Sequence, residues 1–264
     1  MAFVPMLVGT LRGLGSLCCG RSSRPPALAL ACAFLTAVPR AAAGAPALTD
    51  VDWIEQPHTW VAARCGVLVA GGVEEPKLAS GGPFSLALGC DRTIPIEVAV
   101  GRALERGWEL QALYATAPLH LRADSLFWDG AGGGVRLASG TVSMLLVGAS
   151  WGARHRFVKE WGELGDGGLS VGLLLGFAWS GNLEPTSAAR ALLIDRIRAH
   201  PGTLLCLEGR IDQRLHAGLV GSLGLRVGAS SSFLRVDPRP GSDFQPTDVP
   251  FHPVMLWLGL AYWH

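Results

Sequence analysis

The sequence predicts an all-β fold, an eight-stranded antiparallel transmembrane β-barrel with up-and-down meander topology. The chain ends on an uncharged alternating segment, Phe251–His264 (FHPVMLWLGLAYWH), whose even positions from Val254 to Tyr262 are Val, Leu or Tyr. An apolar strand of about ten residues is long enough to cross a bilayer. Glycine, at 35 of 264 residues, is well above its usual share of roughly 7%, and interior glycines disfavour helices. Only 16% of the residues are charged.

The first 43 residues have the features of a secretion signal. Arg21 and Arg24 precede an uncharged run, Pro25–Pro39, and Ala41–Ala43 then offer a small-residue cleavage site. The uncharged run is short for a membrane helix. We therefore expect cleavage near Ala43.

The prediction divides the chain into three segments. Residues 1–43 form the signal segment, residues 44–58 an N-terminal periplasmic segment, and residues 59–264 the barrel. Such a chain would reside in the outer membrane of a Gram-negative bacterium. The formal net charge of +1 argues against a nucleic-acid partner, which usually needs a basic stripe.

Eight segments are predicted to be strands. Most alternate in the way expected of a strand with one apolar face, and Thr141–Trp151 is apolar on both faces. The clearest is Leu169–Ser180 (LSVGLLLGFAWS), where large apolar residues alternate with mostly Gly, Ala and Ser. Large residues facing lipid and small residues facing a narrow interior are what a small barrel requires. The predicted strands are Thr59–Ala70, Thr93–Leu104, Trp108–Pro118, Thr141–Trp151, Leu169–Ser180, Thr203–Asp212, Ala217–Arg235 and the terminal strand from Val254.

The connections between these strands alternate mostly between short and long. Short turns are predicted at Glu105–Gly107 and near Gln213–His216. Polar, Gly-rich or Pro-rich composition predicts three long loops, at Arg122–Ser139, Leu183–Gly202 and Asp237–Pro250. In bacterial barrels, short turns face the periplasm and long loops face the outside.

An α-helical membrane protein is the main alternative fold. Residues 137–153 and 167–183 are each uncharged over seventeen residues, which is close to spanning length. Period-two alternation and interior glycines favour strands in both segments. Helical spacing is evident in Ala188–Arg198 (AARALLIDRIR), which predicts a short amphipathic helix within the second long loop.

Several polar residues fall on the predicted interior faces of the strands. Eight strands leave an interior just wide enough for side chains or one small ligand, and charges placed there must pair or stay hydrated. They could form a plug of salt bridges that closes the barrel, or they could line a restricted path below a hydrophobic mouth. The predicted lumen-lining residues are Arg64, Glu97, Glu109, Gln111, Glu208, Arg210 and Arg226.

Two prolines interrupt the predicted strands. Pro95 and Pro118 each lack the backbone N–H that a β-ladder uses, so we expect them at strand ends, at bulges or at a weak seam. Pro118 is the candidate for a lateral seam, although a proline in this position more often simply ends the strand.

Aromatic residues lie near the predicted strand ends. Such residues form belts at the two bilayer interfaces without any need for a ligand. The residues assigned to these belts are Trp108, Trp151, Trp179, Tyr262 and Trp263.

With the strands placed, the chain resembles the outer membrane protein W (OmpW) family over about Thr59–His264. Trp108–Asp124 is similar to that family's third strand and the basic loop after it, and Leu169–Trp179 to its fifth strand. His252–Tyr262 resembles its ending, Asp-Pro followed by an apolar strand and Gly-Tyr-x-Phe. This sequence departs from the pattern, because His252 replaces Asp, Ala261 replaces Gly and His264 replaces the terminal Phe.

The resemblance implies an eight-stranded outer-membrane barrel with a narrow, largely hydrophobic channel for small apolar molecules and a lateral exit into the membrane. It also implies that Tyr262, Trp263 and His264 form the C-terminal signal for the barrel-assembly machinery. The expected partners are thus outer-membrane lipid, that machinery and small hydrophobic solutes. The expected function is passive uptake of such solutes. The alternative is a structural or interaction barrel with a salt-bridge-plugged lumen that acts through its long loops.

An enzymatic role is not expected. The seven histidines lie in no local setting that resembles a barrel-hydrolase motif, and a Ser/His/acid set requires assumed proximity, for example of His155 and Ser150. We also predict no cofactor and no metal, since the cysteines outside the signal segment form no Cys-x-x-Cys or Cys/His cluster. These cysteines, Cys65, Cys90 and Cys206, allow one disulfide at most.

Overall fold

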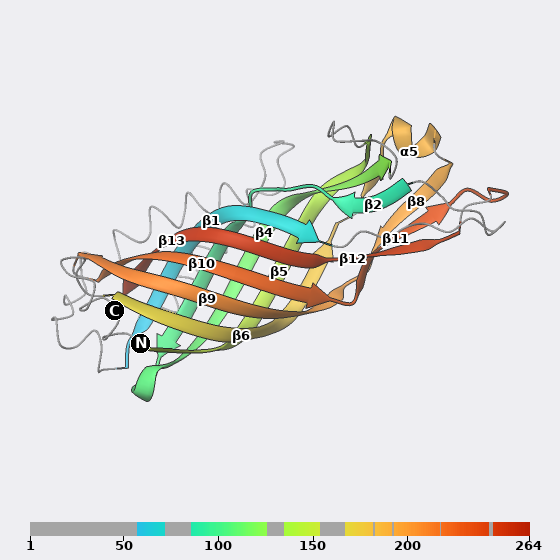
Figure 1. Cartoon of the computed structure of the whole chain (residues 1–264). Coiled ribbons are helices and arrows are strands. Elements are labelled where there is room, and N and C mark those ends of the chain that lie inside the picture. Colours follow the sequence, from blue (N-terminus) through green and yellow to red (C-terminus); the bar gives the residue numbers. More distant parts are fainter. Residues whose placement is uncertain are drawn as a thin grey trace, which may run out of the picture.

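The described residues of the chain form a closed eight-stranded antiparallel β-barrel, as predicted, with a small second sheet at one end (Figure 1). The computed structural model describes residues 57–71, 86–125, 135–153, 167–181, 183–191, 193–216, 218–242 and 245–264. The predicted signal segment and all but the last two residues of the predicted periplasmic segment lie outside these residues.

The barrel strands follow one another around the wall, and β13 pairs with β1 to close it. The closing ladder runs without interruption from the pair Trp60–Trp263 to the pair Gly71–His252, so the terminal apolar segment has no free edge. The barrel strands are β1 (Thr59–Gly71), β3 (Ile96–Ala103), β4 (Trp108–Ser125), β5 (Val135–Ala153), β6 (Gly167–Ser180), β9 (Gly202–His216), β10 (Leu219–Ser230) and β13 (His252–Trp263).

The two ends of the barrel differ in their connections. At one end, the short helix η2 (Glu105–Gly107) joins β3 to β4, and residues 217–218 join β9 to β10. Gly107 and Gly218 have φ of 79° and 71°, a conformation that glycine adopts without steric cost. We call this end, where β1 begins and β13 finishes, the turn end, and the opposite end the loop end. By the usual orientation of bacterial barrels, the loop end faces outside.

The loop end carries more regular structure than the sequence predicted. The strands β4 and β5 pair as far as Ala123 and Val135, so most of the predicted loop Arg122–Ser139 that is described is strand. The predicted single strand Ala217–Arg235 is split, because β11 leaves the barrel to form a second sheet with β8 and β12. The additional elements are β2 (Leu86–Cys90), β7 (Glu184–Pro185), α5 (Ser187–Ala191), β8 (Ile194–Ala199), β11 (Ser232–Pro238) and β12 (Thr247–Pro250).

The predicted amphipathic helix Ala188–Arg198 is wrong over most of its length. Only Ser187–Ala191 is helical, and Ile194–Ala199 is strand β8. The register of β8 against β11 shifts between Asp237 and Pro238. This bulge places Ile194 and Ile197, three residues apart, on the buried face of the strand, and that spacing imitates a helical period.

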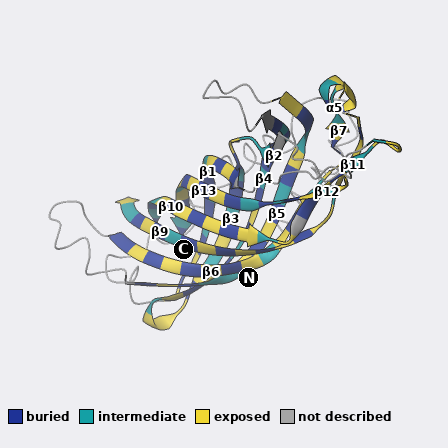
Figure 2. Ribbon diagram, turned by 45° about the vertical axis from the view of Figure 1, so that its right-hand side comes forward, coloured by how far each residue is buried: buried dark blue, intermediate teal, exposed yellow. Residues whose placement is uncertain are grey.

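The outer wall of the barrel is apolar, and the inner faces of the strands are buried (Figure 2). In β6 every second residue from Leu169 to Trp179 is exposed, as the alternation predicted. Trp108 and Trp151 are exposed on the outer wall near the turn end, and Trp179 is exposed nearer the loop end, consistent with belts at two interfaces.

The belt assignment of Trp263 is wrong. Trp263 is only 3% exposed and stacks on His58 with 4.4 Å between ring centroids, so it faces the interior. It shares its face of β13 with Trp257 and Ala261, which are also buried, and this parity decides its direction. Tyr262 lies on the opposite, partly exposed face, and the His264 backbone N–H donates to the Thr59 carbonyl at 2.8 Å.

The helical alternative is not supported by the structure. The two uncharged segments at residues 137–153 and 167–183 contain β5 and β6. Within the described residues, no helix is long and apolar enough to span a membrane. The three described cysteines, Cys65, Cys90 and Cys206, are free thiols, and burial raises the pKa of the Cys90 thiol, at the loop end, to about 12.

Candidate functional site: the barrel interior

The barrel interior is divided along its axis into two chemically different halves. Every buried charged side chain of the described residues lies in the half nearer the turn end, which we call the turn half. The half nearer the loop end, the loop half, is lined by apolar side chains. Those of the loop half include Leu68, Ala117, Leu119, Val142, Met144, Leu174, Ala178, Leu204 and Cys206, each at most 2% exposed.

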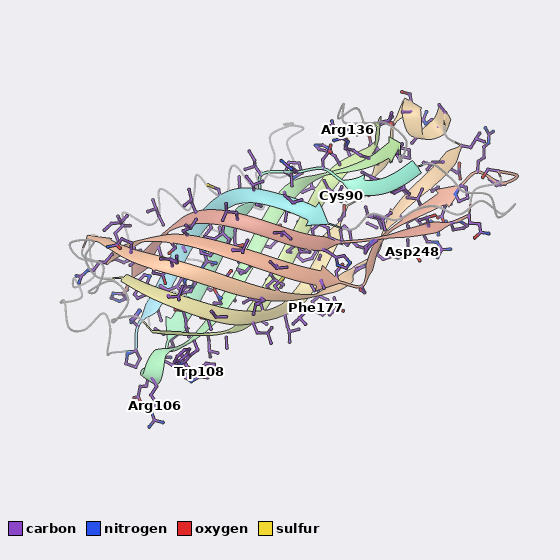
Figure 3. All side chains as sticks on the ribbon, in the orientation of Figure 1. Cys90, Arg106, Trp108, Arg136, Phe177 and Asp248 are labelled. Atoms are coloured by element: carbon purple, nitrogen blue, oxygen red, sulfur yellow. The ribbon has the colours of Figure 1, made fainter. Side chains whose placement is uncertain are left out.

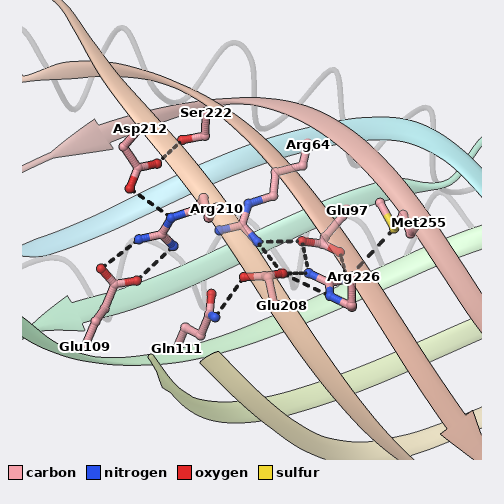
Figure 4. Close-up of polar contacts among 10 residues, drawn as sticks. All are labelled: Arg64, Glu97, Glu109, Gln111, Glu208, Arg210, Asp212, Ser222, Arg226 and Met255. Carbon is pink, nitrogen blue, oxygen red and sulfur yellow. Dashed lines mark hydrogen bonds and ion pairs between the residues drawn. The ribbon is translucent and has the colours of Figure 1, made fainter. Parts of the chain in front are cut away.

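An ionic cluster gathers around Arg226 in the turn half (Figure 4). The Arg226 guanidinium, from β10, donates to both carboxylate oxygens of Glu97 on β3 and to Glu208 on β9. Arg64 on β1 donates to the same Glu97 at 2.9 Å and lies 3.7 Å from Glu208. Two guanidiniums and two carboxylates therefore join strands from opposite sides of the barrel.

A second cluster lies closer to the turn end. Arg210 on β9 donates to Glu109 on β4 and to Asp212 on its own strand, each at 2.9 Å. The Ser222 hydroxyl donates to the other oxygen of Asp212 at 2.6 Å. Gln111, two residues after Glu109, donates to Glu208 of the first cluster at 3.0 Å, so β4 and β9 are joined across the lumen in both clusters.

Two tryptophans cover the Arg64 guanidinium. Its central carbon lies 4.1 Å from the ring centroid of Trp257 and 5.4 Å from that of Trp60, within the range of cation–π attraction. Glycines on neighbouring strands make room for both rings, because a Cβ at Gly224 would lie 2.2 Å from Trp257 and one at Gly101 would lie 2.3 Å from Trp60.

Together these contacts close the turn half of the lumen. The seven charged side chains of the two clusters are at most 4% exposed, so water does not reach them. Buried charges persist only when paired with good geometry, and each of these has at least one oppositely charged partner within 4 Å. The four carboxylates and three guanidiniums leave a formal net charge of −1.

The structure places all seven predicted lumen-lining residues inside the barrel, five of them in contact around Glu208 and the other two, Arg210 and Glu109, paired with each other. Sequence reasoning missed the other members of the network, namely Asp212, Ser222, Trp60 and Trp257. Asp212 continues the inward series that begins at Glu208 and Arg210, so the same alternation could have found it. It was lost because the strand was predicted to end there, whereas β9 continues to His216.

Pro118 lies at an interruption between two barrel strands. It does not end β4, since it pairs with Thr141 on β5. On the other side, the β3–β4 ladder stops at the pair Ile96–Thr116, and the β2–β4 ladder begins only at Cys90–Leu121. Between them, among the described residues, the one backbone bond to β4 is donated by Asp91 N–H to the His120 carbonyl at 3.0 Å.

The backbone N–H that Pro118 lacks would point toward this interruption. Backbone groups two residues apart in a strand point the same way, and the His120 carbonyl points toward the segment between β2 and β3. An N–H at position 118 would point there too. Pro95, the other proline predicted to disturb a strand, stands in that same segment, just before β3.

Only one member of the Ser–His pair named from the sequence lies within the described residues. Ser150 is buried in the interior, and His155 lies outside the described residues. The structure instead brings His120 of β4 and Ser139 of β5 together on the outer wall, with Nδ1 and Oγ 3.2 Å apart. Among the described residues, no acidic side chain is hydrogen-bonded to this imidazole.

The comparisons with known proteins place the fold. No protein-family model matches the chain, and no curated protein matches it. Among solved structures, the outer membrane protein OprG from Pseudomonas aeruginosa matches with a TM-score of 0.62 at 12% identity, covering 80% of this chain and 98% of that one. The outer membrane protein AlkL, solved in lipid bilayers, matches with a TM-score of 0.52 at 12% identity, covering 84% and 95%.

The chain therefore has the fold of a small outer-membrane β-barrel. Both matching structures are barrels of the OmpW type, so the resemblance stated from the sequence is confirmed as a likeness of fold.

Proposed function

We propose that this barrel assists passive entry of small apolar molecules, which pass through the loop half and leave sideways into the membrane between β3 and β4. The apolar side chains of the loop half fill its space, so an entering solute has to displace them. An apolar solute can replace the contacts that they lose. It cannot continue through the turn half without displacing buried ion pairs, which is costly. A lateral exit above the ionic network avoids this barrier.

The interruption beside Pro118 is the observation that carries the proposal. A solute can separate neighbouring strands most easily where few hydrogen bonds hold them, since each backbone bond that is broken in an apolar environment costs about 4–6 kcal/mol. Counting only bonds between residues that the structure describes, the stretch from Ala117 to His120 has one such bond toward β2 and β3. It lies beside the loop half, where Leu119 faces the interior and Pro118 faces out.

The test is the rate at which a small uncharged fluorophore, N-phenylnaphthylamine, enters cells that express the protein. Pro118→Ala supplies the missing N–H and should slow entry severalfold. Pro238→Ala changes a proline of β11, outside the barrel, and should leave entry unchanged. Equal entry rates for wild type and Pro118→Ala, at equal amounts of heat-modifiable barrel, would rule out the lateral route.

A structural or interaction barrel is the second candidate, and the ionic network favours it. Its contacts join strands from across the lumen, and the β8–β11–β12 sheet extends the loop end into a surface for contacts. This candidate predicts no fluorophore entry above that of cells lacking the protein. Neither candidate is enzymatic.

A further inference from the structure

Two arginines face each other on the outer wall at the loop end. Arg122 of β4 pairs directly with Arg136 of β5, and the next outward pair toward the barrel is His120 with Ser139. Arg136 is exposed and the Arg122 side chain is 28% exposed. Figure 3 shows Arg136 at the loop end, at the opposite end of the barrel from Trp108.

Of the two arginines, only Arg122 forms an ion pair with a residue that the structure describes. Asp91 accepts from Arg122 at 2.7 Å. Arg136 forms no ion pair with any residue that the structure describes, and Glu184, which pairs with Ser139 from β7, forms none either. Like charges placed opposite each other on a sheet are destabilising. An external anion between the two guanidiniums would remove this repulsion.

The donors around the pair suit a phosphate group. Guanidiniums bind phosphate oxygens through paired N–H groups. The Ser139 hydroxyl and the neutral His120 imidazole are hydrogen-bonded to each other, which leaves one donor of the two for a ligand on the same face. Thr186 donates its hydroxyl to the Arg136 carbonyl at 2.8 Å, which holds the backbone of β5 in place below the Arg136 side chain.

The position of the pair along the strand indicates where the phosphate comes from. Trp108 is exposed at the start of β4 and marks the aromatic level near the turn end. His120 follows Trp108 on the same strand by roughly 40 Å at about 3.3 Å per residue. With a tilt of about 40°, it stands roughly 30 Å from that level, just beyond an apolar band about 25 Å tall. This is the region of the lipid headgroups rather than of the acyl chains.

We propose that Arg122, Arg136, His120 and Ser139 form a binding site for a phosphate group of lipopolysaccharide in the outer leaflet. One phosphate bridges the two guanidiniums, while Asp91 keeps Arg122 pointed at it. The bound lipid then lies against β4 beside Pro118. This assignment does not depend on solute uptake, because it concerns the outer wall alone.

The site is tested by the affinity of the purified barrel, in non-ionic detergent, for fluorescent lipopolysaccharide. Arg136→Gln should weaken binding about fivefold, the equivalent of about 1 kcal/mol for one arginine at a lipid surface. Arg122→Gln/Arg136→Gln should weaken it further. Arg239→Gln is the matched control, because Arg239 is also exposed beyond β11 at the loop end but lies outside the proposed site. It should bind like wild type.

Two further arms identify the ligand chemistry. Dephosphorylated lipopolysaccharide should bind wild type and Arg136→Gln equally weakly. Inorganic phosphate at millimolar concentration should not displace the lipid. Displacement by inorganic phosphate, an equal effect of Arg239→Gln, or unchanged binding by Arg136→Gln would each overturn the proposal. Equal heat modifiability of all variants in SDS ensures that the folded barrel is compared.

Discussion

The turn half and the loop half of the interior are built on the same eight strands but hold opposite chemistry. In the turn half, Arg64, Glu97, Glu208 and Arg226 tie strands together across the lumen. In the loop half, residues such as Leu174 and Leu204 fill the space by packing alone. The difference shows that a narrow barrel can be closed by ion pairs at one level and by apolar side chains at another. We therefore expect the turn half to be sensitive to the loss of a charge and the loop half to the loss of side-chain volume.

The largest loss of stability is expected from a substitution that removes ion pairs in the turn half. Glu208→Ala removes a carboxylate shared by Arg226, Arg64 and Gln111 and leaves two buried guanidiniums with Glu97 as their one remaining carboxylate partner. Losses of about 3–5 kcal/mol follow from such a change. The measurement is urea unfolding of the barrel in lipid vesicles, followed by tryptophan fluorescence.

The control for this experiment is the neighbouring lipid-facing position. Leu207→Ala removes a side chain of similar size that is 56% exposed on the outer wall, and it should cost much less than Glu208→Ala. A loss below about 1 kcal/mol for Glu208→Ala would show that the network contributes little to stability and that its role lies elsewhere.

A smaller effect is expected from the loop half. Leu174→Ala truncates a fully buried side chain and should cost about 3 kcal/mol through lost burial and the cavity left behind. Leu174→Met keeps the volume and should cost less than about 1.5 kcal/mol. The same urea titration measures both. If Leu174→Met proved as damaging as Leu174→Ala, packing volume would not explain the closure of this half.

The sequence allowed the walls of the barrel to be predicted better than its ends. Alternation identified the inward direction of Glu208 and Arg210 because lipid demands a strict apolar face within the membrane. At the loop end, lipid no longer requires this apolar face. There, β8 has a bulge that imitates helical spacing at Ile194 and Ile197.

Which interior side chains contact one another was harder to predict from the sequence than which side chains face the interior. Alternation shows that Arg226 and Glu97 both face inward, but they are 129 residues apart in the chain. Their contact depends on strand register, shear and the space that Gly224 and Gly101 leave for two tryptophans. The break of the predicted seventh strand at Ser231 could not be predicted either, since β10 and β11 alternate alike but belong to different sheets.

The smallest effect concerns a titratable group outside both halves. Partial burial and the Arg136 guanidinium lower the pKa of His120 below its ordinary 6.5, and Asp91 opposes the shift. The folded imidazole therefore binds its proton less readily than the unfolded one. Above about pH 6.5, the His120 imidazole is mostly neutral in both states and has little effect on the free energy of unfolding. As the pH drops from there toward the folded pKa, the unfolded state binds the proton more readily and the free energy of unfolding falls.

An NMR titration of the His120 ring in detergent micelles measures this shift directly. The midpoint should lie below 6.5 in wild type and rise in Arg136→Gln, since the repulsion from that guanidinium is lost. The neighbouring charges from the packed elements are Asp91 before β3, Arg122 on β4, Arg136 on β5 and Glu184 on β7. A bound lipid phosphate should raise the midpoint in wild type more than in Arg136→Gln. A midpoint that changes neither with the substitution nor with the lipid would show that His120 does not interact with the Arg122–Arg136 pair.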